Sequence, residues 1–179
     1  MSGVRFEFAT ATRVVFGPGS LAELGPIAAS FGSRALLVTG RSPERAEAAR
    51  ERLLAEGVAS IAFSVIGEPT VGDARRGADL ARSEGVDLVV ACGGGSAIDA
   101  GKAVAALLGN GGDPLHYLEV VGRGQPIALP SAPFVAIPTT AGTGSEVTRN
   151  AVLSSPEHRV KASLRSPLML PRAAIVDPD

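Results

Sequence analysis

A repeated alternation of short apolar runs with longer amphipathic runs, over residues 34–109, constrains this chain more than any other feature. Runs such as "RALLVTG" and "VDLVVAC" are continuously apolar, as in parallel strands that are covered on both faces. Helix-type segments such as "SPERAEAARERLLAEG" follow them closely. Strands that alternate with helices through short connections are typical of an α/β domain with a mostly parallel sheet flanked by helices.

The segments on either side of this alternation are less regular. The N-terminal "VRFEFATATRVVFG" alternates polar and apolar residues on both sides of "ATAT", which predicts a β-hairpin. Ser20 and Glu23 predict a capping box for the first helix, and Ser42 is expected to cap the second. Beyond Gly109 the chain is rich in Gly and Pro, and "FVAIP" and "AAIVDPD" predict two further strands. We expect one domain over residues 1–179.

Composition narrows the class of partner. The 179 residues carry a net charge of −1 and no block of Lys and Arg, so nucleic acid is not an expected partner. The single cysteine, Cys92, excludes an internal disulfide and fits a reducing compartment. Pro or charge interrupts every apolar stretch before it reaches the length of a membrane span, and the N-terminus lacks a signal-peptide pattern. We expect a cytoplasmic protein with no membrane partner.

A glycine loop, Gly93, Gly94, Gly95 and Ser96, stands between the run "VDLVVAC" and an alanine-rich helix. Free N–H groups at a helix N-terminus and the helix dipole both favour an anion. Glycine also lets a phosphate approach the backbone without meeting a Cβ atom. The loop therefore predicts a phosphate-bearing ligand, and the alternative is a tight glycine-rich turn with no ligand.

Two well-known phosphate loops do not match this stretch. The P-loop requires Gly where Ser96 stands and Ser or Thr where Ala103 stands. The dinucleotide fingerprint G-x-G-x-x-G has Ile98 in place of its third glycine, and the loop here follows a later strand than in that fold.

A second loop, "TTAGTGSEVT", follows the strand "FVAIP" and concentrates hydroxyl groups at Thr139, Thr140, Thr143 and Ser145. These groups are able to bond a phosphate, a ribose or an amide, and the alternative is a polar turn before a helix. Because ligands of open α/β sheets gather at the carboxyl ends of the strands, two such loops together favour a nucleotide site.

At these two loops the chain resembles the iron-containing alcohol dehydrogenase family. The resemblance rests on "GGGSAIDAGKAVA" and "AIPTTAGTGSEVT", and "GEPTVGDARRG", "GDPLHYLE" and "LPRAAIVDPD" fit the same pattern in order. It covers essentially the whole chain. It implies an oxidoreductase that uses NAD or NADP and a small-molecule substrate, is a homo-oligomer, and has a Rossmann-like nucleotide-binding domain followed by a helical metal-binding domain.

The resemblance also implies cofactor contacts. Gly93, Gly94, Gly95 and Ser96 would hold the pyrophosphate, with Asp99 on the first turn of the same helix. The remaining contacts fall to the adenine, ribose and nicotinamide parts of the cofactor, and they involve Pro69, Thr70, Thr139, Thr140, Thr143, Ser145, Thr148 and Lys161.

One departure from the family pattern concerns cofactor choice. Family members that use NAD often carry an Asp after the second strand, where it accepts hydrogen bonds from the ribose 2′-OH. Here Gly40 takes that position, and Arg41 and Ser42 follow it. Without the carboxylate a 2′-phosphate is not repelled, and Arg41 is able to pair with it. We therefore expect NADP to be accepted.

The metal of the family, iron or zinc, is held by an Asp and histidines that lie beyond the "VDP" motif. This chain ends at Asp179, directly after that motif, so the helical domain and its ligands are expected outside it. His116 and His158 lack ligand spacing and are interpreted as loop histidines.

No catalytic base is assigned. Three charged residues near the loops have other expected roles: Asp99 bonds the glycine-loop backbone, Lys102 points to solvent or a phosphate, and Glu146 pairs locally. Cys92 is expected to be a buried apolar residue and not a nucleophile.

Three functions remain open on these residues. The first is the cofactor half of an enzyme that moves hydride between a nicotinamide and an alcohol, aldehyde or ketone, with a maleylacetate-type reductase as a variant. The second is a stand-alone or truncated nucleotide-binding module without catalysis. The third is a structural protein whose two loops are ordinary turns.

Overall fold

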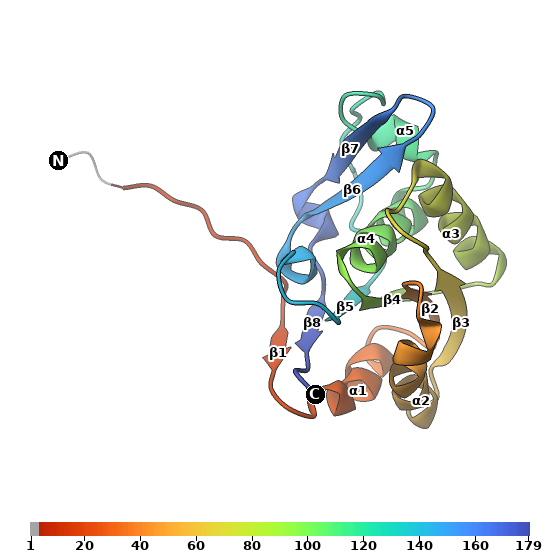
Figure 1. Ribbon diagram of the computed structural model, residues 1–179, viewed down its shortest axis with the longest axis vertical. Helices are drawn as coiled ribbons and strands as arrows, with labels where there is room; N and C mark the ends of the chain where they lie inside the picture. The colour runs from red at the N-terminus through yellow and green to blue at the C-terminus, as the bar shows by residue number, and fades with distance from the viewer. Residues whose placement is uncertain (1–3) are drawn as a thin grey trace.

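A six-stranded parallel sheet between two layers of helices forms the body of the protein in a computed structural model that describes residues 4–179 (Figure 1). Neighbouring strands are all parallel, which confirms the predicted sheet. Every residue of the strand Leu88–Gly93 is buried, because helices cover both faces of the sheet. In spatial order the strands are β1 (Val14–Phe16), β8 (Ala173–Val176), β5 (Phe134–Pro138), β4 (Leu88–Gly93), β2 (Arg34–Thr39) and β3 (Ala59–Ser64).

The helices divide between the two faces. α1 (Leu24–Ala29) and α2 (Glu47–Ala55) pack on one face, and α3 (Val71–Ser83) and α4 (Gly95–Asn110) pack on the other. Successive side chains of a strand alternate between these layers. In β2, for example, Leu37 joins the α1–α2 side of the core and Leu36 joins the α4 side. Short 3₁₀ helices cover Ser20–Glu23, Pro43–Ala46, Ser145–Val147 and Pro167–Met169.

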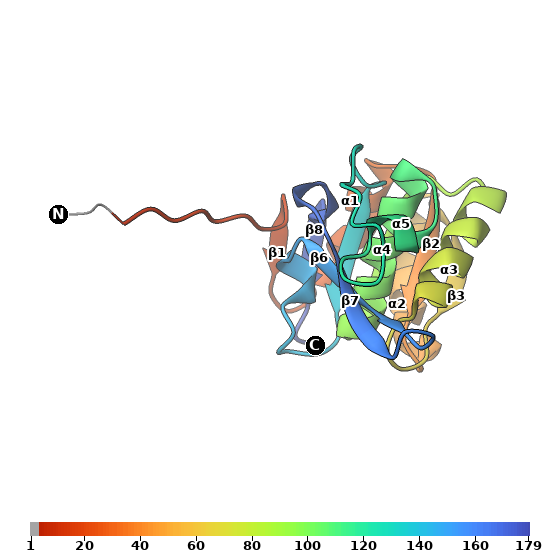
Figure 2. The same ribbon diagram turned by 90° about the horizontal axis from the view of Figure 1, so that it is seen from above.

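α4 is buried on nearly all sides, because a second layer covers its outer face. An antiparallel hairpin, β6 (Asn150–Ser155) and β7 (Val160–Arg165), packs there together with α3 and the short α5 (Pro114–Tyr117), as Figure 2 shows from above. This hairpin is absent from the predictions made on the sequence. Its strands bury only alternate residues, so they lack the continuous apolar runs that revealed the sheet.

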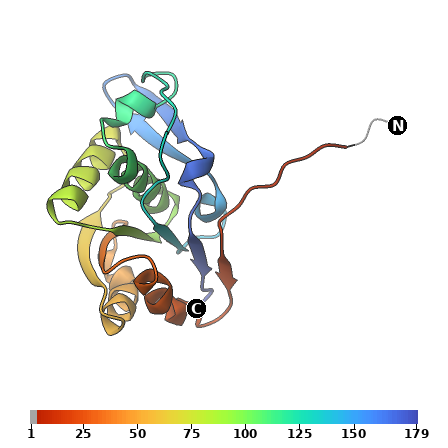
Figure 3. The same cartoon turned by 180° about the vertical axis from the view of Figure 1, so that it is seen from behind.

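The predicted N-terminal hairpin is wrong. Residues 4–13 contain no strand, and β1 alone enters the sheet, where it pairs in parallel with β8. β1 is an edge strand that pairs only with β8, and residues 4–8, which have no strand partner in the described part of the chain, extend away from the body (Figures 1 and 3).

Two predicted caps also differ. Gly19, in the left-handed conformation, precedes the 3₁₀ turn at Ser20, so Ser20 lies inside the turn and the capping box with Glu23 is wrong. Ser42 does occupy the N-cap of the next turn, but its side chain makes no capping hydrogen bond within residues 4–179. No helix in that same range is long and apolar enough to cross a bilayer.

Close packing of α4 on the sheet requires a glycine at position 101. A Cβ atom there would lie 2.8 Å from the Phe134 ring and 2.9 Å from the Cβ of Ala91. We expect Gly101→Ala to cost about 1–3 kcal/mol of unfolding free energy from overpacking. That cost exceeds the gain of about 0.5–1 kcal/mol from removing a helical glycine.

Gly72→Ala, in α3, is the matched control, because its new methyl would meet no atom closer than 3.4 Å. It should leave stability unchanged or slightly raised in urea unfolding. A Gly101→Ala protein as stable as Gly72→Ala would contradict the close packing of α4.

Candidate functional site

The strand order places a switch point between β2 and β4. From β2 the chain moves to β3 on one side, and it then returns to β4 on the other side before continuing to β5 and β8. In open α/β sheets, ligands bind outside the carboxyl ends of the strands at such a point. The segments that leave these ends are those after Thr39, Gly93 and Pro138, which are the three stretches that the sequence analysis selected.

The glycine loop presents the N-terminus of α4 at this edge. Gly93 ends β4 and Gly94 is the N-cap of the 16-residue helix. The first hydrogen bond within the helix runs from Ile98 N to Gly94 O at 3.1 Å. The main-chain N–H groups of Gly95 and Ser96 therefore precede the helical ladder and are oriented, with the helix dipole, to bind an anion.

The threonine loop lies directly against the glycine loop. Thr139 N donates to Gly93 O at 3.0 Å. A Cβ atom on Gly95 would lie 2.9 Å from the side chain of Thr143, whereas one on Gly94 would meet Thr140 only at 3.4 Å. The structure thus brings the two predicted loops together, and the side chains of Thr139, Thr140 and Thr143 are exposed to solvent beside the helix N-terminus.

The segment after β2 completes the same edge. A Cβ atom on Gly93 would lie 3.4 Å from Gly40 N, so the backbone of β2 passes close to the glycine loop. Arg41 is exposed and Ser42 is half-buried. The stretch expected to select between NAD and NADP therefore adjoins the stretch expected to hold the pyrophosphate.

Lys102 does not point to solvent or to a phosphate, as the sequence suggested. Its side chain is completely buried, and Nζ donates to Ser145 O at 2.9 Å, to Thr148 Oγ1 at 3.0 Å and to Asn150 O. Burial lowers the pKa of Lys102, and the nearby Asp99 carboxylate partly offsets this effect. The ammonium joins α4 to both ends of the segment that connects the threonine loop to β6.

Asp99 supports this arrangement and does not bond the glycine loop. Its Oδ2 accepts from Val152 N at 3.1 Å, and Oδ1 lies 3.2 Å from Lys102 Nζ as an ion pair without hydrogen-bond geometry. Asp99 therefore contacts β6 and the neighbouring Lys102 of α4. The predicted bond from Asp99 to the glycine-loop backbone is wrong. Glu146 also differs from expectation, because its buried Oε2 has no hydrogen-bond partner in residues 4–179.

A small hollow of about 160 Å³ gathers other predicted residues. Pro69, Ser96, Asp99 and Lys161 all line it, although they come from three separate segments of the chain. Lys161 forms an exposed ion pair with Glu68 at its rim. Thr70 lies apart from this hollow as the N-cap of α3, where its hydroxyl takes part in a capping box with Asp73.

A larger cleft of about 910 Å³ opens at the carboxyl ends of β5 and β8, and no sequence motif indicates it. Its walls come from both ends of the chain, which no local pattern connects. Asp177 is fixed there by main-chain N–H groups of Leu21 and Gly19, at 2.8 and 3.0 Å, and hydrogen bonds led by that of Leu21 lower the pKa of its carboxyl. Cys92 also lines the cleft, and burial raises the pKa of its thiol to about 11, so it stays protonated at neutral pH.

Metal ligands do not converge in the part of the chain that the structure describes. No group of three or more His, Cys, Asp or Glu side chains there is placed to hold an ion. His158 Nδ1 lies 2.7 Å from Ser155 Oγ in a turn, and His116 lies in α5. The described residues fit a nucleotide and do not fit an iron or zinc centre.

Comparison with known proteins agrees with this geometry. The model of the iron-containing alcohol dehydrogenase family matches residues 11–178. A Caenorhabditis elegans protein named mitochondrial hydroxyacid-oxoacid transhydrogenase is 34% identical over 182 residues, which cover 97% of this chain and 38% of that protein.

Two crystal structures superpose closely on the fold. That of a 1,3-propanediol oxidoreductase has a TM-score of 0.91 at 32% identity, and covers 98% of this chain and 46% of that one. That of a sulfoacetaldehyde reductase from Bifidobacterium kashiwanohense in complex with NAD⁺ has a TM-score of 0.85 at 32% identity, over 98% and 47% of the two chains. The present chain thus spans less than half the length of these relatives.

Removal of the buried Asp99–Lys102 ion pair tests how the two loops are held. Lys102→Met leaves the Asp99 carboxylate buried without its cation, so we expect a loss of about 3–5 kcal/mol in unfolding free energy. The double variant Asp99→Asn/Lys102→Met removes both charges and should recover part of that loss. The exposed Lys161→Met should change stability by less than about 1 kcal/mol in the same urea titration. Equal losses for Lys102→Met and Lys161→Met would show that the buried ammonium does not hold the loops.

Proposed function

The chain belongs to the iron-containing alcohol dehydrogenase family, and we propose that it is the dinucleotide-binding part of an oxidoreductase that uses NAD or NADP. One observation carries the proposal: the glycine loop opens α4 at the switch point of a parallel sheet, with the threonine loop packed beside it. That combination places oriented N–H groups and exposed hydroxyls beside each other.

The proposed cofactor position follows from this edge. The pyrophosphate lies on the N–H groups of Gly94, Gly95 and Ser96, where the helix dipole favours its charge. The ribose on the adenosine side lies near Gly40 and Arg41. The nicotinamide side extends along Thr139, Thr140 and Thr143 toward the large cleft, and Pro69 and Lys161 border the hollow next to Ser96.

Some of the residues implied by the resemblance act indirectly in this proposal. Lys102 Nζ donates hydrogen bonds to the hydroxyl of Thr148 and the carbonyl of Ser145. Asp99 accepts a hydrogen bond from the main chain of β6. These groups position the threonine loop, and the exposed hydroxyls that it carries contact the cofactor. Thr70 likewise acts through the start of α3.

The proposed reaction is hydride transfer between the nicotinamide ring and an alcohol, aldehyde or ketone. The names of the relatives fit this class, since propanediol, hydroxyacids and sulfoacetaldehyde are all alcohols or carbonyl compounds. When bound, a divalent metal would polarise the substrate oxygen. Its ligands have to come from residues outside the described set, so the described residues hold and orient the cofactor.

Two alternatives use the same site. Reduction of an unsaturated keto acid, as in maleylacetate reductases, would need the same nicotinamide position and stays a prediction. A nucleotide-binding module without catalysis would bind the cofactor equally well and transfer no hydride. A cytoplasmic location also stays a prediction.

Nucleotide titration tests the proposal. The purified chain should bind NADH, NADPH or ADP-ribose saturably by calorimetry. Gly94→Ala should raise the dissociation constant about tenfold, because the methyl fits the protein but narrows the approach to the helix N-terminus. Gly72→Ala, at the N-terminus of α3, should leave binding unchanged. A folded sample that binds none of the three nucleotides would favour the alternative in which the two loops are ordinary turns without a ligand.

Cofactor choice has a separate test at the end of β2. We expect NADPH to be accepted, with an affinity within about tenfold of that of NADH, because Gly40 stands directly after β2 in place of a carboxylate that would repel the 2′-phosphate. Arg41→Ala should weaken NADPH about tenfold and leave NADH unchanged, since a charge-assisted contact is lost from one ligand only. NADH that binds more than about tenfold tighter than NADPH to the unaltered chain would overturn this expectation.

A further inference from the structure

A pocket of about 200 Å³ lies at the edge of the sheet opposite the candidate cofactor site. Thr12, Ala132 and Arg172 line it, and they stand one or two residues before β1, β5 and β8, which are neighbours in the sheet. Since these strands are parallel, the pocket lies at their amino ends. The length of β5 separates it from the threonine loop by roughly 16 Å. The pocket is therefore no part of the proposed nucleotide site.

The hydroxyl of Ser131 is an unsatisfied polar group in the wall of this pocket. Its Oγ is buried and has no hydrogen-bond partner in residues 4–179. The main chain around it is fixed, because Ser131 N donates to Leu168 O at 3.2 Å and Ala132 N donates to Ala105 O at 3.0 Å. A buried hydroxyl without a partner costs free energy. One water would need only about 10–15 Å³, so the pocket has room for a larger ligand.

The charge of the pocket favours an anion. Arg172 is exposed, and its guanidinium forms no ion pair within residues 4–179. The eight residues that line the pocket include no Asp or Glu. A guanidinium presents a planar fork of N–H donors that fits a carboxylate, and the hydroxyls of Ser131 and Thr12 supply further donors.

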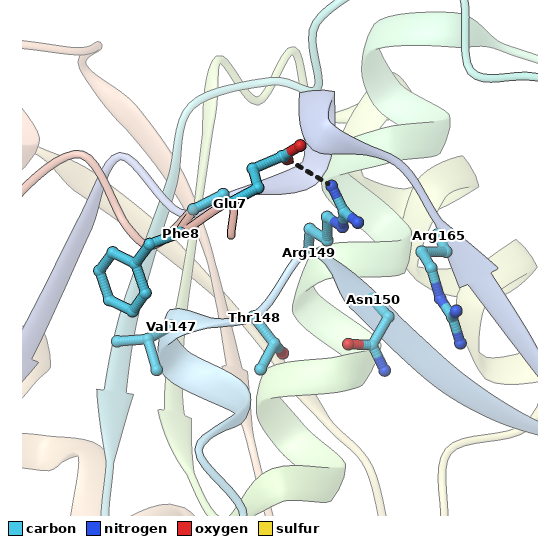
Figure 4. A pocket seen from close by; sticks show the side chains of 8 residues that line it. Glu7, Phe8, Val147, Thr148, Arg149, Asn150 and Arg165 are labelled. Atoms are coloured by element: carbon cyan, nitrogen blue, oxygen red, sulfur yellow. Dashed lines mark ion pairs between the residues drawn. The ribbon is translucent and has the colours of Figure 1, made fainter. Parts of the chain in front are cut away.

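Figure 4 shows a pocket with more arginine and a poorer claim to an anion. Its volume is about 460 Å³, and Arg149 and Arg165 line it. Glu7 lines it as well, with Oε1 at 3.6 Å from a terminal nitrogen of Arg149. The negative charge of Glu7 repels a second anion there. Arg172 has no such carboxylate in the wall of its own pocket, so that smaller pocket is the better anion site.

The remaining walls are apolar and restrict the rest of the ligand. Leu168, Leu170, Pro130 and Pro167 lie around the polar groups. An anion with polar oxygens on every side, such as phosphate, would place unpaired oxygens against these side chains. The volume is below the range of about 300–1,000 Å³ that is usual for drug-sized ligands. The pocket therefore suits a small molecule with one anionic end and one apolar end.

We propose that this pocket is a second ligand site, which binds a small monocarboxylate with a short apolar tail. The carboxylate pairs with the Arg172 guanidinium and accepts a hydrogen bond from Ser131 Oγ. The tail lies against Leu168 and Leu170. The site is separate from the proposed cofactor site, and neither proposal depends on the other.

Titration of the full chain with benzoate tests the proposal by calorimetry, because benzoate joins one carboxylate to a small apolar ring. Benzoate should bind saturably with a dissociation constant below about 10 mM. Benzamide, its uncharged analogue, should bind at least about tenfold more weakly. Inorganic phosphate and ADP-ribose should not displace benzoate. Absence of saturation, equal binding of benzoate and benzamide, or displacement of benzoate by either competitor would overturn the proposal.

Two substitutions assign the binding to this pocket. Arg172→Gln should weaken benzoate about tenfold and leave benzamide unchanged, whereas Arg123→Gln, at an exposed arginine outside the pocket, should change neither. Ser131→Ala should also weaken benzoate, yet the free chain should be as stable in urea as before or more stable, because an unsatisfied hydroxyl is removed. Unchanged benzoate affinity in either pocket variant, or a less stable Ser131→Ala chain, would refute the assigned contacts.

Discussion

The buried ammonium group of Lys102 determines how the two candidate nucleotide loops meet. It lies in the helix that opens at the glycines, and it bonds main-chain oxygens of Ser145 and Asn150, where the threonine loop passes into β6. A buried charge without partners is very unfavourable, so this segment is constrained to follow α4. The glycine loop, the threonine loop and the β6–β7 hairpin are consequently held as one unit, and the exposed hydroxyls beside the helix N-terminus depend on it.

The crowding at this junction separates the roles of the glycines. A methyl group on Gly93 would collide with Ala97, and one on Gly95 would collide with Thr143, so both glycines are needed for packing with or without a ligand. Gly94 has room for a methyl group and an ordinary φ of −73°. Packing therefore does not explain why it is a glycine, whereas close approach of a ligand does. A tight turn and a phosphate site are thus complementary accounts of one loop.

Much of the candidate site was predictable because its signals are local. The glycines follow a continuously apolar strand, and the threonines follow another, so their position at the carboxyl ends of parallel strands follows from the alternation alone. The roles of Asp99, Lys102 and Glu146 were not predictable in this way. Asp99 and Lys102 have partners in a segment some fifty residues away, and the buried Oε2 of Glu146 has no hydrogen-bond partner in residues 4–179. In the sequence, a charged residue near a glycine loop looks the same whether its side chain faces solvent or the core.

By itself the sequence determined the order of strands and helices over residues 34–109, the mostly parallel sheet, the two loops and the family, because continuous apolar runs, glycines and motifs are properties of neighbouring residues. Only the tertiary structure decided that β6 and β7 cover α4, that Lys102 is buried beneath them, that the cleft joins both ends of the chain, and that residues 4–8 stay outside the sheet. The physical reason is that burial, pairing and cavity shape arise from contacts between segments far apart in the chain, which no local pattern encodes.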